Sequence, residues 1–166
     1  MSINWLVVLG AGFIPLILGF IWYHPKVFGT IWIQLAGVSE EKAKQSNMAL
    51  IFGVTLLLGI FLSAAMLTMV IHQTHMMSSL MNIPGFGVEG SEVNTYYLDF
   101  LNKYGNEFRT FKHGALHGMI GGILIAFPIV SVNAMFEQRS FKYILINAGF
   151  WTACMILIGG VISAFA

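Results

Sequence analysis

The chain has 166 residues, of which 57% are hydrophobic and 9% are charged, and its formal net charge is +1. A soluble domain has roughly 25% charged residues, so this chain lacks the polar side chains needed to cover a surface in water. The near-zero charge gives no basis for binding nucleic acid, and the single cysteine excludes an intramolecular disulfide.

Four apolar segments predict four transmembrane spans, at about residues 4–24, 47–72, 113–136 and 141–165. A helix needs about 20 residues to cross a bilayer core of about 30 Å. Lipid offers no hydrogen-bond partners, so a segment of this length satisfies its backbone N–H and C=O groups only as a helix. We therefore predict an all-α integral membrane protein. Its four transmembrane helices form a bundle, with short interfacial helices, in a single membrane domain over residues 1–166.

Short helices at the membrane surface are predicted in two connections. After Pro25, apolar residues recur at helical spacing up to Gly37, which is typical of a helix lying in the interface. Residues 73–112 form a predicted extramembrane cap, which begins with a flexible stretch, "SSLMNIPGFGVEGSE". An amphipathic helix follows, because five apolar residues share one helical face: Tyr97, Phe100, Leu101, Tyr104 and Phe108.

Prolines and small residues predict how the spans bend and pack. Pro15 and Pro128 predict kinks in the first and third spans. Small residues lie on one face of the third and fourth spans, where they allow two backbones to approach closely: Gly114, Gly118, Gly122, Gly149 and Gly160. We interpret them as packing residues within the chain, with a stripe that serves a homo-oligomer or a partner subunit as the alternative.

Four histidines are predicted at one membrane face. His72 and His75 end the second span, and His113 and His117 begin the third, so the topology places both pairs together. Such pairs on adjacent helices fit a transition-metal or haem site. The alternative is that they are interfacial side chains bonded to backbone and water, and our first expectation is no cofactor.

Polar residues also gather at the turn between the third and fourth spans. Ionisable groups at membrane depth are costly and usually paired, so Glu137 is expected to pair with Arg139 or Lys142. Asn133 is expected to bond Asn147 across the hairpin. We interpret the group as a clasp of this turn, with a proton or ion path as the alternative.

Two stretches resemble a known bacterial family. "WYHPKVFGTIWIQLAG", followed by "SEEK" and "NMALIFG", and the later "NAMFEQRSFKYILINAGFW" are similar to small four-span proteins described as domain of unknown function 1761. The resemblance implies an inner-membrane, multi-span protein and supplies no activity. It also implies a shared polar-aromatic feature made of Trp22, Tyr23, Pro25, Phe28, Gly29, Asn133, Glu137, Arg139 and Asn147. With His24 among them, these residues form a predicted binding interface.

We expect a non-enzymatic protein, because no catalytic constellation is evident in the sequence. Its predicted role is an accessory or assembly subunit of a membrane complex, or a small-ligand binder. The alternatives are a small oligomeric transporter or channel, and a histidine-based metal or haem protein. Predicted partners are the lipid bilayer and either further copies or a larger membrane complex, without nucleic acid.

Basic residues number five in the first and third loops and three in the second, which favours both termini and the long loop on the periplasmic side of the bacterial inner membrane.

Overall fold

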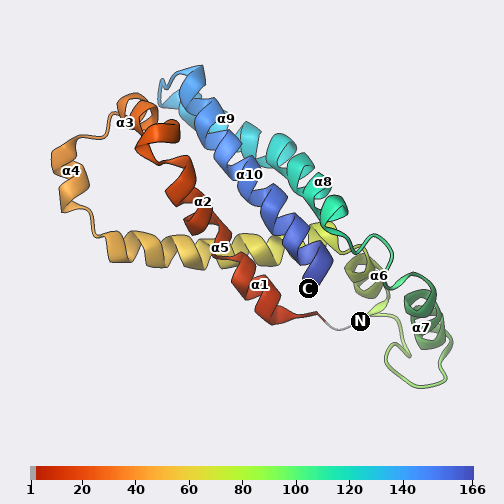
Figure 1. The fold of residues 1–166 in the computed structure, drawn as a ribbon. Helices are drawn as coiled ribbons and strands as arrows, with labels where there is room; N and C mark the ends of the chain where they lie inside the picture. The colour runs from red at the N-terminus through yellow and green to blue at the C-terminus, as the bar shows by residue number, and fades with distance from the viewer. Residues whose placement is uncertain (1–2) are drawn as a thin grey trace.

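The computed structural model describes residues 3–166, apart from the side chains of Glu40 and Lys42. Within this part of the chain all regular structure is helical (Figure 1). Four helices are long and apolar enough to cross a membrane: Trp5–Trp22, Met48–Val70, Phe111–Phe136 and Phe141–Phe165. The all-α, four-span fold class predicted from the sequence is confirmed.

Two of the spans are interrupted. The first consists of α1 (Trp5–Ala11) and α2 (Ile14–Trp22), which meet just before Pro15. The third consists of α8 (Phe111–Gly121), a π-helical turn η2 (Gly122–Ala126) and α9 (Phe127–Phe136), which carries Pro128 in its first turn. Proline removes one backbone donor and crowds the preceding turn, so the interruptions fall where the sequence predicted kinks.

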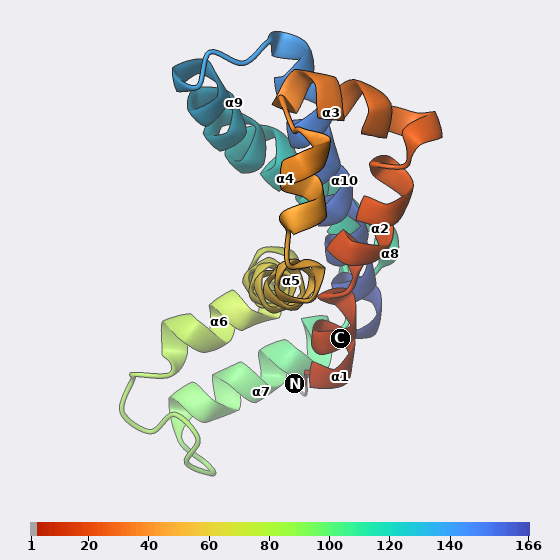
Figure 2. The ribbon, with the colours of Figure 1, turned by 90° about the vertical axis from the view of Figure 1, so that its left-hand side faces the viewer.

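The second and fourth spans are continuous helices, α5 (Met48–Val70) and α10 (Phe141–Phe165). The α10 helix is the centre of the molecule, because it packs against α1, α2, α5, α8 and α9. Half of α10 is buried, against about a fifth of each other span. In Figure 2, α5 is seen end-on while α2 and α10 lie in the plane, so α5 crosses them steeply.

Glycines lie where neighbouring helices approach each other most closely. Side chains on Gly114 or Gly118 would collide with the backbone of α10, and one on Gly122 would meet Thr152. A Cβ on Gly160 would meet the Phe111 ring, and one on Gly149 would lie 3.3 Å from the indole of Trp22. The five predicted packing glycines therefore all face neighbours within the chain.

The connections are helical as well. After the first span come a π-helix η1 (Pro25–Gly29), α3 (Thr30–Ala36) and α4 (Glu40–Gln45). The cap contains α6 (Gln73–Leu80) and α7 (Glu92–Tyr104), which lie side by side and project away from the spans (Figure 2). The first three residues of the predicted flexible stretch instead complete α6.

One helix boundary was predicted wrongly. The amphipathic helix ends at Tyr104, and Phe108 lies outside it with φ +61°. Gly105 and Asn106 favour the end of a helix, and the chain must then turn back to begin α8 at Phe111.

Candidate functional site

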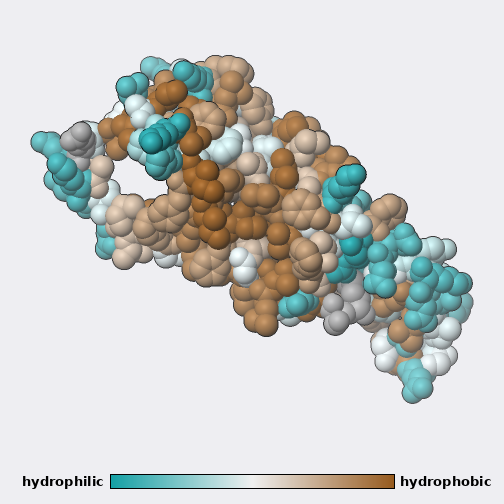
Figure 3. Space-filling view, viewed as in Figure 1, coloured by the Kyte–Doolittle hydropathy of each residue, from teal (hydrophilic) through white to brown (hydrophobic). Residues whose placement is uncertain are grey.

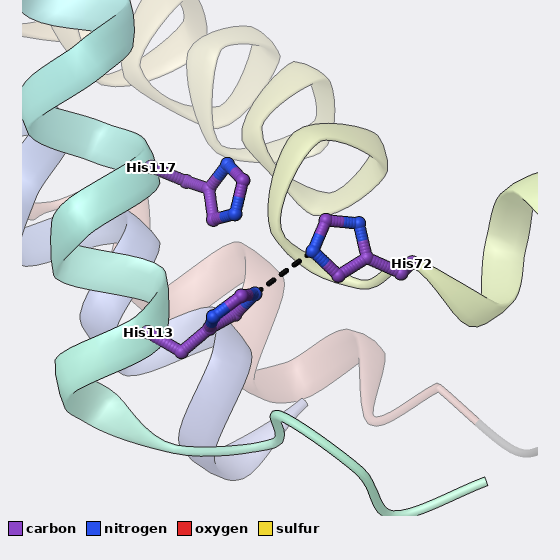
Figure 4. A group of neighbouring side chains, drawn as sticks. All are labelled: His72, His113 and His117. Carbon is purple, nitrogen blue, oxygen red and sulfur yellow. Dashed lines mark hydrogen bonds between the residues drawn. The ribbon is translucent and has the colours of Figure 1, made fainter. Parts of the chain in front are cut away.

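Three histidines from two segments come together at the end of the molecule that carries the cap. His72 follows α5 and is the N-cap residue of α6, whereas His113 and His117 lie one turn apart on α8. The Thr110 hydroxyl oxygen accepts a hydrogen bond from the backbone N–H of His113 at 3.2 Å and so fixes the start of α8. Since residues four apart share a helix face, both α8 rings point toward His72 (Figure 4).

The ring nitrogens of this group, which we call the three-histidine cluster, are close enough to share one ion. The Nε2 atoms of His72 and His113 are hydrogen-bonded at 2.9 Å, and one ligand nitrogen from each of the three rings lies within 4.8 Å of the others (Figure 4). Tetrahedral zinc with Zn–N bonds of about 2.0–2.1 Å holds its ligand nitrogens about 3.3 Å apart. Shifts of about 1 Å in the side chains would therefore bring all three nitrogens onto one ion.

The surroundings of His72 favour its neutral, metal-binding form. Burial lowers the pKa of His72 below its usual value, and nearby His117 and His75 lower it further by repulsion between like charges. A metal ion binds the unprotonated imidazole nitrogen, so a lowered pKa keeps that lone pair available at neutral pH.

The fourth predicted ligand lies beside the cluster. The ring of His75 is exposed, and its centroid is 6.2 Å from that of His72. Among the described residues, the group whose ligand atoms converge consists of His72, His113 and His117. The structure therefore brings three of the four predicted ligands together.

Hydrogen bonds hold the loop between α7 and α8 next to this cluster. The Gln73 side chain donates hydrogen bonds to the backbone oxygens of Tyr104 and Glu107, at 2.9 and 3.0 Å. The ring centroid of Phe108 lies 5.1 Å from that of His113. The Phe108 backbone oxygen accepts a hydrogen bond from the Ser163 hydroxyl. Sequence reasoning missed these positioning residues; the available signal was a glutamine that directly follows a predicted histidine ligand, His72.

A second site lies at the opposite end of the spans, around Asn147 on α10. Its Oδ1 accepts hydrogen bonds from the Tyr23 hydroxyl at 3.3 Å and from the Trp32 indole at 3.1 Å. Its Nδ2 donates to the Tyr143 backbone oxygen at 2.8 Å. Asn147 thus joins the end of the first span to α3 and α10, as expected if the two family-like stretches meet.

The neighbouring aromatic and turn residues extend this arrangement. The Trp22 indole donates to the Ile146 backbone oxygen at 3.2 Å, and its ring centroid lies 4.8 Å from that of Phe28. Pro25 begins η1, where the His24 Nδ1 accepts a hydrogen bond from the backbone N–H of Lys26. A neutral His24 ring therefore carries its proton on Nε2.

The predicted clasp at the turn is present in part. Glu137 Oε2 lies 3.6 Å from Arg139 Nε, and the Arg139 guanidinium lies over the Tyr143 ring and 3.4 Å from the Leu35 backbone oxygen. Asn133 is exposed, and its expected bond to Asn147 is not formed. The Asn147 side chain turns instead toward Tyr23 and Trp32, because these aromatic donors would otherwise lack an acceptor within the spans.

A groove that the sequence did not reveal lies beside Asn147. It has a volume of about 790 Å³ and is formed mainly by α2, α5 and α10. Its lining includes Gly19, Phe20, Tyr23, Phe52, Thr55 and Asn147. We call it the α2–α5 groove.

The fold and these two sites define a class: a four-span helical membrane protein with a histidine cluster at one end of its spans and a polar-aromatic group at the other. The comparison with protein families matches residues 6–163 to the family described as protein of unknown function DUF1761. The chain belongs to this family. No curated protein and no solved structure matched the chain in these comparisons.

Proposed function

We propose that this protein is a non-enzymatic multi-pass membrane protein that binds a transition-metal ion through His72, His113 and His117. The observation that supports the proposal most strongly is the convergence of three imidazole nitrogens within 4.8 Å from segments 41 residues apart. Imidazole suits Zn²⁺, Cu²⁺ and Ni²⁺, whereas hard cations such as Mg²⁺ prefer oxygen ligands.

A single ion fits the cluster better than a haem does. A haem with two histidine ligands needs their nitrogens on opposite faces of a flat macrocycle. Here the ring centroids of His72, His113 and His117 are 4.5 to 4.9 Å apart, so all three rings surround one small volume. Three histidines leave one tetrahedral position for water or for a ligand brought by a partner.

The transporter or channel alternative receives less support. It requires Asn133, Glu137 and Asn147 to line one path across the membrane. Asn133 and Glu137 are exposed around the turn, whereas the Asn147 oxygen is bonded to Tyr23 and Trp32. These contacts support a structural role for Asn147, so we place the function at the histidine cluster.

Metal titration of the purified protein in detergent tests the proposal. We expect one Zn²⁺ per chain, measured by calorimetry and by competition with a chromophoric chelator. Removing a supporting residue outside the ligand set usually costs 10–100-fold in metal affinity, so His117→Ala should cost about 100-fold or more. His75→Ala is the matched control and should bind as the unmodified protein does. Stoichiometric binding that His117→Ala leaves unchanged, or no binding at all, contradicts the proposal.

We also propose the role as an accessory or assembly subunit, since an ion held by three histidines would keep a coordination position open to a group from another protein. Purification from native membranes in a mild detergent, followed by identification of co-purifying chains, tests this role. We expect a partner whose recovery falls with His117→Ala and stays unchanged with His75→Ala. Recovery of the chain alone under conditions that keep other membrane complexes intact would argue against a subunit.

A further inference from the structure

The α2–α5 groove has a clear structural origin. The first span crosses α5 where Gly12 and Gly59 meet, with a Cβ on Gly59 blocked by the Gly12 backbone oxygen. The groove lining on these two helices runs from Pro15 to Tyr23 and from Met48 to Leu58, all on one side of the crossing. The two helices diverge from this crossing toward α3 and α4 (Figure 1), and the groove lies between their diverging parts.

The groove is apolar along the spans and polar at one end. Its walls are mainly apolar, with Phe20, Ile51 and Phe52 among them and Thr55 as a polar member, and its α3 end is lined by Tyr23 and His24. Figure 3 shows the hydrophobic surface over α2 and α5, with an opening beside it toward α3. A molecule that matches this distribution has a long apolar part and a polar group at one end.

The size of the groove limits what can occupy it. A spanning helix about 10–12 Å wide and about 30 Å long fills more than roughly 2,000 Å³. The groove offers about 790 Å³, which lies in the range of about 300–1,000 Å³ typical of small-molecule sites. At the depth of the spans the surrounding solvent is lipid, so an acyl chain is the occupant that fits both volume and location.

The polar end favours an anionic head group. The His24 ring presents an N–H donor at Nε2, because its Nδ1 accepts the backbone N–H of Lys26. Lys26 follows two residues later and is exposed, Arg139 lies in the turn between α9 and α10, and Lys142 lies in the first turn of α10 at the same end. Over the described side chains, this end carries four basic residues and two acidic ones, so its charge favours an anionic group.

We propose that the α2–α5 groove binds an amphipathic lipid with an anionic head group. Its acyl chain lies between α2 and α5, and its head group lies at His24 and Lys26. This site is at the opposite end of the spans from the three-histidine cluster and does not depend on metal binding.

Photolabelling in vesicles tests the lipid site. The full-length protein is reconstituted in phosphatidylcholine vesicles with a small fraction of phosphatidylglycerol that carries a photoactivatable group on its acyl chain. Labelled peptides are then mapped by mass spectrometry. We expect labelling concentrated on α2 and α5, and several-fold stronger than with the same probe on phosphatidylcholine. Thr55→Trp should fill the groove and reduce this labelling several-fold, whereas Leu57→Trp, on the same helix outside the groove, should not.

Three results would overturn the proposal. Labelling spread evenly over every lipid-facing helix would show no site, and equal labelling by both probes would remove the head-group preference. A separate experiment with a bifunctional cross-linker that joins two chains through α2 and α5 would show that a second copy covers the groove. A second variant, His24→Ala, distinguishes loss of the lipid site from a packing defect that Thr55→Trp could introduce. It should weaken the phosphatidylglycerol preference while the protein keeps its monodisperse elution.

Discussion

At the residue scale, Asn147 shows how one polar side chain organises an apolar end of the molecule. Its single Oδ1 accepts from Tyr23 and Trp32, and its amide donates back to the Tyr143 backbone oxygen. Water is scarce at this depth, so each of these donors depends on its protein acceptor. Asn133 is also an asparagine within an apolar span near the same turn, yet its side chain is exposed.

The two asparagines form a matched pair for mutation. Asn147→Ala leaves the Tyr23 and Trp32 donors without their acceptor and should lower the free energy of unfolding by about 1–3 kcal/mol. Asn133→Ala should change it by less than about 0.5 kcal/mol, because the side chain is exposed. Thermal unfolding in detergent measures both, and equal effects would contradict the structural role of Asn147.

Protonation of His72 contributes to the pH dependence of metal binding at the three-histidine cluster. The pKa of His72 lies below the usual value of about 6.5, chiefly because the ring is partly buried. The neutral ring binds the ion, so affinity should hold at pH 7.5 and fall as the pH drops below about 6.5, where the imidazole begins to take up a proton. Zn²⁺ titrations at pH 7.5, 6.5 and 5.5 measure this change. An affinity that is constant or rises toward pH 5.5 would contradict binding through histidine.

At the element scale, the contact between α8 and α10 is the closest packing of two spans. Gly114 faces Gly159 and Ser163, and Gly118 faces the backbone at Met155. Lipid gives no hydrophobic drive for helices to associate, so close backbone approach supplies the attraction. The same contact holds His113 and His117 in place, because they lie on α8 next to these glycines.

A pair of glycine substitutions separates packing from helix propensity. Gly118→Ala puts a Cβ into the α10 backbone and should lower the free energy of unfolding by about 1–3 kcal/mol, or more if α8 shifts. Gly53→Ala has nothing within 4 Å of the added Cβ and should be neutral or stabilise by about 0.5–1 kcal/mol through helix propensity. Denaturation in detergent distinguishes them, and a neutral Gly118→Ala would show that the two helices are not in contact.

Much of the fold could be predicted from the sequence, because the length and apolarity of a span are local properties. The kinks at Pro15 and Pro128 and the end of α3 at Gly37 are local as well. The histidine pairs could be placed at one membrane face by topology, but their convergence to three ligands depends on how α5 and α8 are rotated. The α2–α5 groove could not be predicted, since it arises from the steep crossing at Gly12 and Gly59.

At the scale of the whole molecule, the two ends of the spans differ in chemistry. One end carries the cap, both described ends of the chain and the three-histidine cluster, and the other carries α3, α4 and the turn between α9 and α10 (Figure 1). The contact between Arg139 and the Leu35 backbone oxygen joins the first and third loops. The bias of basic residues leads us to propose that these loops are cytoplasmic and the cap periplasmic.

Cysteine labelling in intact bacteria tests this orientation. Gly87→Cys in the cap should react with a membrane-impermeant maleimide, whereas Lys142→Cys should react only after the cells are opened. The native Cys154 is buried and should stay unlabelled in the folded protein. The reverse pattern would place the three-histidine cluster on the cytoplasmic side.

X-ray absorption spectroscopy of the protein loaded with one equivalent of Zn²⁺ tests most directly whether the three histidines bind a metal ion. Metal binding at the three-histidine cluster predicts three imidazole nitrogens at about 2.0–2.1 Å from the metal. It also predicts the loss of one of them in His117→Ala, with His75→Ala unchanged. A shell of oxygen atoms alone, or a spectrum that His117→Ala does not alter, would contradict metal binding at His72, His113 and His117.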